Sequence, residues 1–337
     1  MSVKPKPELV KNGPDDQILD LALRPQTFED YIGQERIKAN LRVAIGASQK
    51  RKEQIEHVLL HGPSGLGKTT LAYLIAKELG ATIKITSGTA LEKAGDVGSI
   101  LTGLSDGDIL FIDEVHRLNK SVEEVIYPAM ENFKLDIIIG KGNSAKTLQI
   151  DLPRFTLIAA TTKISLLSAP FRSRFGMHFR LAFYEKEEIK KIVRRSAKLL
   201  GIKIQDDALD MIAKSSRFTP RIANRLLKRA RDYAQINDSS TVTLATASAS
   251  LEMLEIDDHG LDETDRKILL AISSKFNGGP VGLKNIAASI SEEEATIEDV
   301  YEPYLMQIGF LARTPKGRII TTDGAAHIKS PIAKLKL

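Results

Sequence analysis

The chain has 337 residues, of which 42% are hydrophobic and 27% are charged, and its formal net charge is +5 at pH 7. A chain of this length usually forms two or three domains with a large buried interior. It has no cysteine, which excludes disulfides and thiolate zinc sites, and its six histidines do not follow the spacing of a metal motif. No apolar run approaches the ~20 residues that cross a bilayer, so we expect no membrane partner. The absence of cysteine favours the cytoplasm as the compartment. The basic balance fits a nucleic-acid partner but also an ordinary soluble protein.

Residues 1–20 are rich in Lys, Pro, Asn and Asp and lack the apolar core of a signal peptide, so we expect a flexible tail there. Residues 21–183 alternate short β-rich runs with helical stretches such as Thr69–Leu79. The β-rich runs are His57–His61, Thr82–Thr86, Asp108–Asp113 and Phe155–Thr161. This alternation predicts an α/β domain, a parallel sheet with covering helices.

One segment of this first unit departs from the alternation. Leu135–Ile139 and Thr147–Leu152 flank residues 140–144, a Gly-containing polar run, and predict a β-hairpin inserted at about 133–152. An exposed hairpin of this kind either holds a partner or is a tolerated insertion, and the residues leave both interpretations open.

Residues 184–256 read as a small all-α domain, in which an apolar helical stripe ends at Gly201 and Thr219-Pro220 predicts the start of another helix. Residues 257–337 predict a third unit. Its helices are expected near Asp262–Ser274, Leu283–Ile290 and Glu294–Gln307, followed by a two-strand ribbon across residues 314–318. That order is typical of a winged-helix module, a relative of the helix-turn-helix DNA readers.

Residues 62–69, Gly-Pro-Ser-Gly-Leu-Gly-Lys-Thr, match the phosphate-binding loop between an apolar strand and a helix. The backbone N–H groups of such a loop cradle the phosphates of a nucleotide. Lys68 would contact the β- and γ-phosphate oxygens of ATP, and Thr69 would bind Mg²⁺. A Gly-rich turn without function is the alternative for this motif on its own.

The run Ile109–Glu114 supplies the second half of a nucleotide site, because it is an apolar strand that ends in two carboxylates. Asp113 would hold Mg²⁺, and Glu114 would polarise the attacking water. Two acids at a strand end are common and are often only solvated. After a phosphate loop in a βαβ pattern, however, they indicate nucleotide hydrolysis.

Later polar residues would complete the hydrolysis site. Thr161 and Thr162 end a predicted strand, where either could sense the γ-phosphate. Arg174 could reach the nucleotide of a neighbouring subunit as an arginine finger, and Arg221 could reach the γ-phosphate from the helical domain. By residue type alone, each has a simpler alternative. A strand-end threonine is more often a β former or a cap, Arg174 would form a surface ion pair, and Arg221 would lie on a solvated helix face.

With these residues in place, the chain resembles the RuvB family of AAA+ ATPases over nearly its whole length. The runs that carry the resemblance are spread over all three units: 23–25, 31–35, 65–70, 110–118, 135–142, 160–162, 174–176, 219–227 and 309–315. RuvB-like motors are homo-hexameric rings that draw duplex DNA through themselves and drive Holliday-junction branch migration in homologous recombination and DNA repair. The resemblance therefore implies an ATP-hydrolysing DNA translocase.

The resemblance also implies site residues and partners. Arg174 becomes the finger in trans and Arg221 the sensor. The hairpin at 133–152 becomes the docking element for the junction-binding protein RuvA, and the resolvase RuvC follows by family association. Residues expected around the bound ATP are Leu23, Arg24, Tyr31, Ile32, Gly65, Leu66, Gly67, Lys68, Thr69, Thr70, Glu131, Asn132, Phe133 and Tyr184.

The resemblance assigns the DNA contacts to the wing, at Arg313, Lys316 and Arg318. The local charge agrees, because residues 305–337 contain six Lys or Arg and one Asp. We therefore expect sequence-independent binding to the DNA backbone with a steep salt dependence. Phe218 departs from the family pattern, which usually has Gly before Thr219-Pro220-Arg221, and a bulky residue takes a left-handed conformation only at a cost. Asn132 stands where Asp is usual.

Three other functions remain as alternatives. Another AAA+ machine, such as a clamp-loader subunit or a protein unfoldase, would show a helical collar or an aromatic pore loop, and Ser87–Gly98 has no aromatic residue. A two-lobed helicase needs a second α/β lobe, whereas the residues after 184 are mainly helical. A nucleotide-switched DNA-binding scaffold would not need Glu114, Thr162 and Arg174 together.

Overall fold

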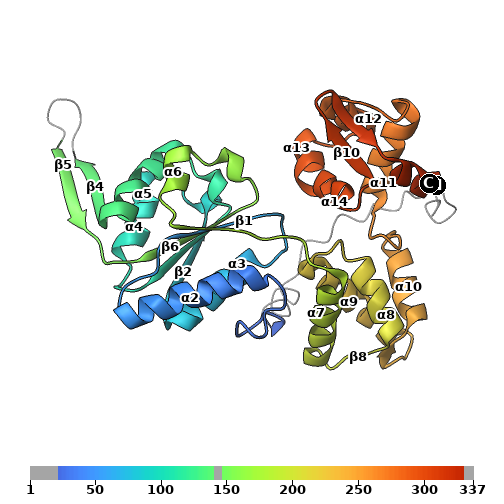
Figure 1. Cartoon of the computed structure of the whole chain (residues 1–337), viewed down its shortest axis with the longest axis horizontal. Coiled ribbons are helices and arrows are strands. Elements are labelled where there is room, and N and C mark those ends of the chain that lie inside the picture. The colour runs from blue at the N-terminus through green and yellow to red at the C-terminus, as the bar shows by residue number, and fades with distance from the viewer. Residues whose placement is uncertain (1–21, 140–145, 330–337) are drawn as a thin grey trace, which may run out of the picture.

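The computed structural model describes residues 22–139 and 146–329, which Figure 1 shows as three units that follow one another along the chain. The tail expected at residues 1–20 and the hairpin tip at residues 140–144 lie outside the described residues. Within the described residues, no helix is both long and apolar enough to cross a membrane.

The first unit is built on a five-stranded parallel sheet, in the order β2-β3-β6-β1-β7. The predicted strands are confirmed to within a residue at each end. The sequence did not reveal β7, an edge strand that is only partly buried. The strands are β1 Val58–His61, β2 Ile83–Ser87, β3 Ile109–Asp113, β6 Thr156–Thr161 and β7 Met177–Arg180.

Helices cover both faces of this sheet, and alternate strand residues enter the two resulting cores. Leu60 and Phe111 face the core that contains α2 and α3, whereas Leu59 and Ile112 face the core that contains α4 and α5. Figure 1 shows α2 and α3 on one side of the sheet and α4 and α5 on the other. The helices are α2 Glu35–Arg51, α3 Lys68–Leu79, α4 Ala94–Thr102, α5 Lys120–Asn132 and α6 Ala169–Ser173.

The inserted hairpin is confirmed as an antiparallel pair, β4 (Lys134–Ile139) with β5 (Lys146–Asp151). Its base is fixed by Leu135, which is buried in the core beneath α4 and α5. Figure 1 shows the hairpin projecting from the sheet domain on the side away from the other two units. The hairpin therefore extends into solvent in the single chain.

The second unit is a helical bundle with one small correction. It was predicted to be all-α, but β8 (Lys203–Ile204) and β9 (Thr241–Val242) form a two-residue parallel pair between the helices. Thr219 precedes a helix as predicted, although its hydroxyl donates to the Arg217 carbonyl at 2.9 Å and does not cap the helix. The helices are α7 Lys186–Leu199, α8 Asp206–Lys214, α9 Pro220–Ile236 and α10 Leu244–Met253.

The third unit has the winged-helix order that the sequence predicts. The region expected as one helix, 294–307, is continuous but contains a π-helical turn, η6 (Ile297–Tyr301). A second π turn, η5 (Ala271–Lys275), extends the first helix. An isolated antiparallel β-bridge between Val281 and Arg318 adds one residue pair beside the ribbon. The other elements are α11 Glu263–Leu270, α12 Leu283–Ile290, α13 Glu294–Thr296, α14 Glu302–Gln307, β10 Leu311–Thr314, β11 Gly317–Ile320 and α15 Thr322–Lys329.

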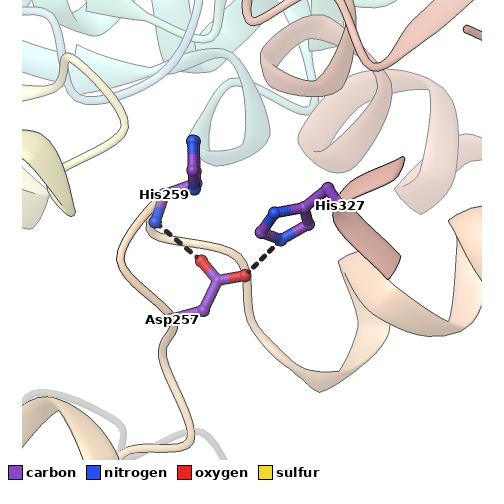
Figure 2. Close-up of side chains that lie close together, drawn as sticks. All are labelled: Asp257, His259 and His327. Atoms are coloured by element: carbon purple, nitrogen blue, oxygen red, sulfur yellow. Dashed lines mark hydrogen bonds and ion pairs between the residues drawn. The ribbon is translucent and has the colours of Figure 1, made fainter. Parts of the chain in front are cut away.

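Two histidines that are distant in the sequence meet Asp257 where the second and third units join (Figure 2). The buried carboxylate of Asp257 accepts a hydrogen bond from the backbone N–H of His259 at 2.9 Å and lies 2.8 Å from Nε2 of His327. It also accepts from the backbone N–H of Leu261 at 2.9 Å. The ring of His259 lies beside Asp258, with Nδ1 at 2.9 Å from its carboxylate. Both oxygens of the Asp257 carboxylate thus have a partner, so the group acts as a clamp that fixes α15 to the interdomain segment.

Candidate nucleotide site and DNA-contact surface

The loop between β1 and α3 has the backbone geometry of a phosphate cradle. Gly65 and Gly67 have φ angles of 80° and 98°, in the left-handed region that favours glycine. A Cβ atom on Gly65 would lie 2.7 Å from a Thr219 carbon, and one on Gly67 would lie 2.8 Å from the Tyr31 hydroxyl. These glycines are therefore required both by the turn and by the packing around it.

Lys68, at the first position of α3, folds back on its own loop. Its ammonium donates to the carbonyls of Gly62 and Pro63, each at 2.8 Å. The pKa of Lys68 is lowered to about 8, mainly by burial, with the charge of Asp113 opposing the shift and that of Arg221 adding to it. The side chain is therefore close to its titration range before any phosphate is present.

Thr69 and Asp113 bring two oxygen groups together beside the loop. The Thr69 hydroxyl donates to Oδ2 of Asp113 at 3.1 Å, and the backbone N–H of Glu114 donates to Oδ1 at 2.9 Å. Hydroxyl and carboxylate oxygens are the ligands that Mg²⁺ prefers, so this pair fits the ion that the sequence implies.

Glu114 holds a strained backbone conformation, with φ 48° in the left-handed region. Its carboxylate lines the cavity and pairs with Arg117 at 2.9 Å, with both side chains about half exposed. A surface pair of this kind contributes little free energy, so the carboxylate can leave Arg117 at little cost.

The structure separates the two threonines at the end of β6. Thr161 is buried, and its hydroxyl lies 2.9 Å from Nδ1 of His116. Burial lowers the pKa of His116, so the imidazole is neutral near pH 7. Thr162 instead is exposed and lines the cavity. Of the two candidates, only Thr162 therefore faces the space beside the loop.

At the opposite end of the loop, two phenols hold one backbone carbonyl. Tyr31 and Tyr184 both donate to the Leu66 carbonyl, at 3.3 Å and 3.1 Å. Burial raises the pKa of Tyr184 to about 12, so its hydroxyl remains a donor at all physiological pH values. Leu66 itself is fully buried, so it supports the loop from behind while its neighbours face the cavity.

A cavity of about 410 Å³ lies between the sheet domain and the helical domain. Most of the expected ATP-contact residues line it: Leu23, Arg24, Tyr31, Ile32, Gly65, Gly67, Lys68, Thr69, Thr70, Asp113, Glu114, Thr162, Tyr184 and Arg221. A second set of lining residues was not predicted from the sequence: Pro25, Asp30, Ser64, Ile192, Arg195, Ser196, Pro220 and Asn224. Several of these lie on α7 and α9, where an amphipathic pattern marks a buried face but not what it covers.

Arg221 reaches the cavity from the start of α9, directly after an unusual turn. Arg217 and Phe218 both have left-handed φ angles, 56° and 52°. Phe218 thus adopts the conformation that was expected to be unfavourable for a bulky residue. Its ring packs in the winged-helix core, 6.0 Å from the ring of Tyr304, and its carbonyl accepts from Tyr184 N at 3.1 Å. This packing offsets the backbone strain.

Arg174 lies outside the chain's own cavity. Its guanidinium pairs with Glu131 at 3.0 Å and stacks over the ring of Tyr127 at 4.5 Å. Glu131, Asn132 and Phe133, which were expected beside the nucleotide, do not line this cavity either. The structure therefore brings Arg174 and the end of α5 together on a surface separate from the loop.

On the wing, Arg313 and Arg318 face each other across the β10–β11 ribbon. Both guanidinium groups bind the carboxylate of Glu302, with Nη2 of each at 3.0 Å from Oε2. The side chain of Arg313 is 46% exposed, whereas that of Arg318 is only 14% exposed. Lys316 lies between them in the turn that joins the strands.

The fold and the cavity together define a P-loop ATPase of the AAA+ class, with a helical lid and a C-terminal winged-helix domain. Three family models match in chain order: the Holliday junction DNA helicase RuvB P-loop domain at residues 23–181, the RuvB AAA lid domain at 184–257 and the RuvB C-terminal winged helix domain at 258–329. The chain belongs to the RuvB family.

Similar proteins cover nearly the whole chain. The Holliday junction branch migration complex subunit RuvB of Dehalococcoides mccartyi is 57% identical over 317 residues, which are 94% of this chain and 91% of the relative. The subunit of the same name from Clostridium kluyveri is 56% identical over 308 residues, 91% of this chain and 88% of the relative. The solved Thermotoga maritima RuvB, described as a Holliday junction branch migration motor, superposes with a TM-score of 0.84 at 50% identity and covers 92% of this chain and 99% of that chain.

Proposed function

We propose that this chain is the ATP-driven motor of a Holliday-junction branch-migration complex. The observation that carries the proposal is the convergence of Lys68, Thr69, Asp113 and Glu114 in one cavity of a chain that belongs to the RuvB family. An interdomain cavity lined by convergent polar groups suits a nucleotide whose hydrolysis moves the domains.

Each of these side chains has a role that its position supports. Lys68 leaves the Gly62 and Pro63 carbonyls and donates to the β- and γ-phosphate oxygens of ATP. Thr69 and Asp113 would hold Mg²⁺, which when bound neutralises phosphate charge. Glu114 leaves Arg117 and orients the attacking water, and Thr162 donates to the γ-phosphate.

The remaining polar group of the reaction comes from a second subunit. Arg174 lies outside the chain's own cavity, and Glu131 already compensates its charge. We propose that in a homo-hexameric ring Arg174, with residues 131–133, meets the neighbour's nucleotide, while Arg221 senses it from the lid. Hydrolysis is then weak in the isolated chain and increases on assembly and on DNA. A fully active monomer would contradict this arrangement.

The partners follow from the two surfaces that project from the motor. The wing binds the DNA backbone without reading sequence, through Arg313, Lys316 and the less exposed Arg318. The hairpin β4–β5 is proposed to dock a RuvA-type junction-binding protein, and RuvC-type resolvase activity would follow on the same junction. Three consecutive isoleucines, Ile137–Ile139, would suit an apolar contact with this partner, and their side chains lie outside the described residues.

The decisive experiment is ATP-driven dissociation of a synthetic four-way DNA junction, with and without a cognate RuvA. Wild type should dissociate the junction only with ATP, and it should do so faster with RuvA. Glu114→Gln should bind ATP but lose roughly 10²- to 10⁴-fold in the rate of ATP hydrolysis. Mixing Arg174→Ala subunits with Glu114→Gln subunits tests the trans finger, since only mixed rings can form complete sites. ATP hydrolysis without any junction movement would refute the branch-migration assignment.

A further inference from the structure

The wing arginines are held by two carboxylates in very different surroundings. The Glu302 side chain is 2% exposed and receives four hydrogen bonds, from Nε and Nη2 of Arg313 and of Arg318, at 3.0 to 3.1 Å. The Glu298 side chain is 47% exposed and uses a single oxygen, Oε1, at 2.9 Å from Arg313 and 3.4 Å from Arg318. One carboxylate is thus enclosed by the pair of arginines, and the other lies at their solvent side.

Burial sets what each carboxylate can do. Burial alone would raise the pKa of Glu302, but the bonds from Arg313 and Arg318 outweigh it, and the pKa lies below its ordinary value. A buried carboxylate with four charged hydrogen bonds cannot leave without exposing uncompensated charge. The half-exposed pairs of Glu298, in contrast, are cheap to break.

The charges of this cluster matter for a wing that binds DNA. Two arginines and Glu302 leave one positive charge, and Glu298 cancels it. Oε1 of Glu298 lies between two guanidinium groups, and a phosphate oxygen could take the same position. Arginine side chains bind carboxylate and phosphate with the same geometry. In the free chain, the two arginines expected to bind DNA are therefore already occupied.

We propose that the two carboxylates have opposite roles: Glu302 is a positioning residue that holds the arginine pair in register for the DNA backbone, and Glu298 occupies the phosphate position and is displaced by DNA. This inference rests on the proposed function of the wing as a DNA contact. Glu302 would orient the DNA-binding arginines in advance, and Glu298 would block them until DNA binds.

Matched substitutions separate the two roles, because Glu298→Gln and Glu302→Gln are isosteric and each removes one negative charge. Plain electrostatics predicts that both tighten binding. We expect instead that Glu298→Gln tightens duplex binding several-fold with little change in the salt slope, because the same phosphate is engaged but no acid has to be displaced first. Glu302→Gln should weaken binding and flatten the slope. Glu294→Gln, on exposed α13 of the same domain, is the control for a general change in charge.

Fluorescence anisotropy of a labelled duplex, measured on the full chain from 50 to 300 mM salt (roughly the range over which phosphate contacts dominate affinity), gives both readouts. ATP affinity and thermal unfolding, measured in parallel, show whether each variant is folded. If Glu302→Gln is not folded, Glu302→Asp keeps the charge but shortens the side chain and should still weaken binding.

The outcomes separate three failures. If Arg313→Ala does not change duplex affinity, the wing is not the DNA contact and the proposed function of this surface fails. If Arg313→Ala weakens binding but both glutamine variants tighten it equally, the wing binds DNA and the positioning role of Glu302 is wrong. If Glu298→Gln behaves like Glu294→Gln, Glu298 does not occupy the phosphate position.

Discussion

Nζ of Lys163 lies 2.5 Å from a carboxylate oxygen of Asp299, so the loop after β6 in the ATPase domain is ion-paired with the winged-helix domain. Lys163 directly follows Thr162, which faces the nucleotide cavity, and Asp299 directly follows Glu298, which faces the wing arginines. Figure 1 shows α13 of the winged-helix domain turned toward the ATPase domain. One ion pair thus joins the two functional surfaces.

We expect Asp299→Asn to reduce the ratio of DNA-stimulated to basal ATP hydrolysis by roughly 1.4- to 5-fold, the range that a pair worth about 0.2 to 1 kcal/mol allows. ATP affinity should stay unchanged, because Asp299 does not line the cavity. The ratio is measured with and without saturating duplex. Glu294→Gln is the control, and a charge-swapped double variant, Lys163→Asp with Asp299→Lys, should recover part of the loss. An unchanged ratio would rule out coupling through this pair.

Nucleotide binding should take up a proton at alkaline pH. The pKa of Lys68 is lowered to about 8 in the free chain, mainly by burial, and ATP phosphates favour the charged amine. Lys68 is charged in both states well below pH 8, so proton uptake appears only as the pH rises through about 8, and ATP affinity falls above that pH.

Calorimetric titration with ATP in two buffers of different ionisation enthalpy measures this uptake at pH 7 and pH 9. Lys68→Arg is the control, because a guanidinium does not titrate in this range. Equal binding enthalpies in both buffers at pH 9 would show that Lys68 stays protonated in the free chain.

At position 218 we expect a substitution by glycine to be less destabilising than a substitution by alanine. Phe218→Ala removes the packing against Tyr304 but keeps a Cβ atom in the left-handed region, whereas Phe218→Gly removes both the packing and the strain. We therefore expect the glycine variant to be more stable than the alanine variant by about 1 kcal/mol. Both should be less stable than wild type. Thermal unfolding ranks the stability of the three chains. If the alanine variant were more stable than the glycine variant, the backbone would not be strained at this position.

Of the two histidines at the Asp257 clamp, only the side chain of His327 should contribute to stability. His327→Ala removes a nearly buried partner of Asp257, so we expect a loss of about 1 to 3 kcal/mol in the free energy of unfolding. His259→Ala should change it little, because that ring is about one-third exposed and its bond to Asp257 comes from the backbone. Urea unfolding measures both. Similar losses for the two variants would show that the His259 ring is part of the clamp.

Much of the fold was predictable because its signals are local. The phosphate loop, the apolar strands and the helix after the loop each depend on neighbours in sequence, and these elements begin and end within about a residue of the predictions. The π turns and β7 were not predictable in this way. An edge strand such as Met177–Arg180 is only partly buried, so no continuous apolar run marks it.

The site was predictable where chemistry lies in a motif and not where it lies in packing. Lys68, Thr69, Asp113 and Glu114 follow from spacing alone. The pairing of Arg318 with Glu302, however, joins residues on different elements, and nothing in the basic pattern of the wing shows that an acid neutralises it. Likewise, the cavity residues of α7 and α9 became recognisable only once the lid was placed over the loop.

The hydrophobic cores also determine how the chain comes apart. The core under α2 and α3 continues without a break into the lid, through residues such as Ile189 and Leu226, whereas the winged-helix core is a separate cluster reached from the lid through Phe218. The sheet domain and lid should therefore melt as one cooperative unit, with the winged helix as a second. A calorimetric scan of the free chain would show two heat-absorption peaks, and added ATP would move only the one that contains the loop.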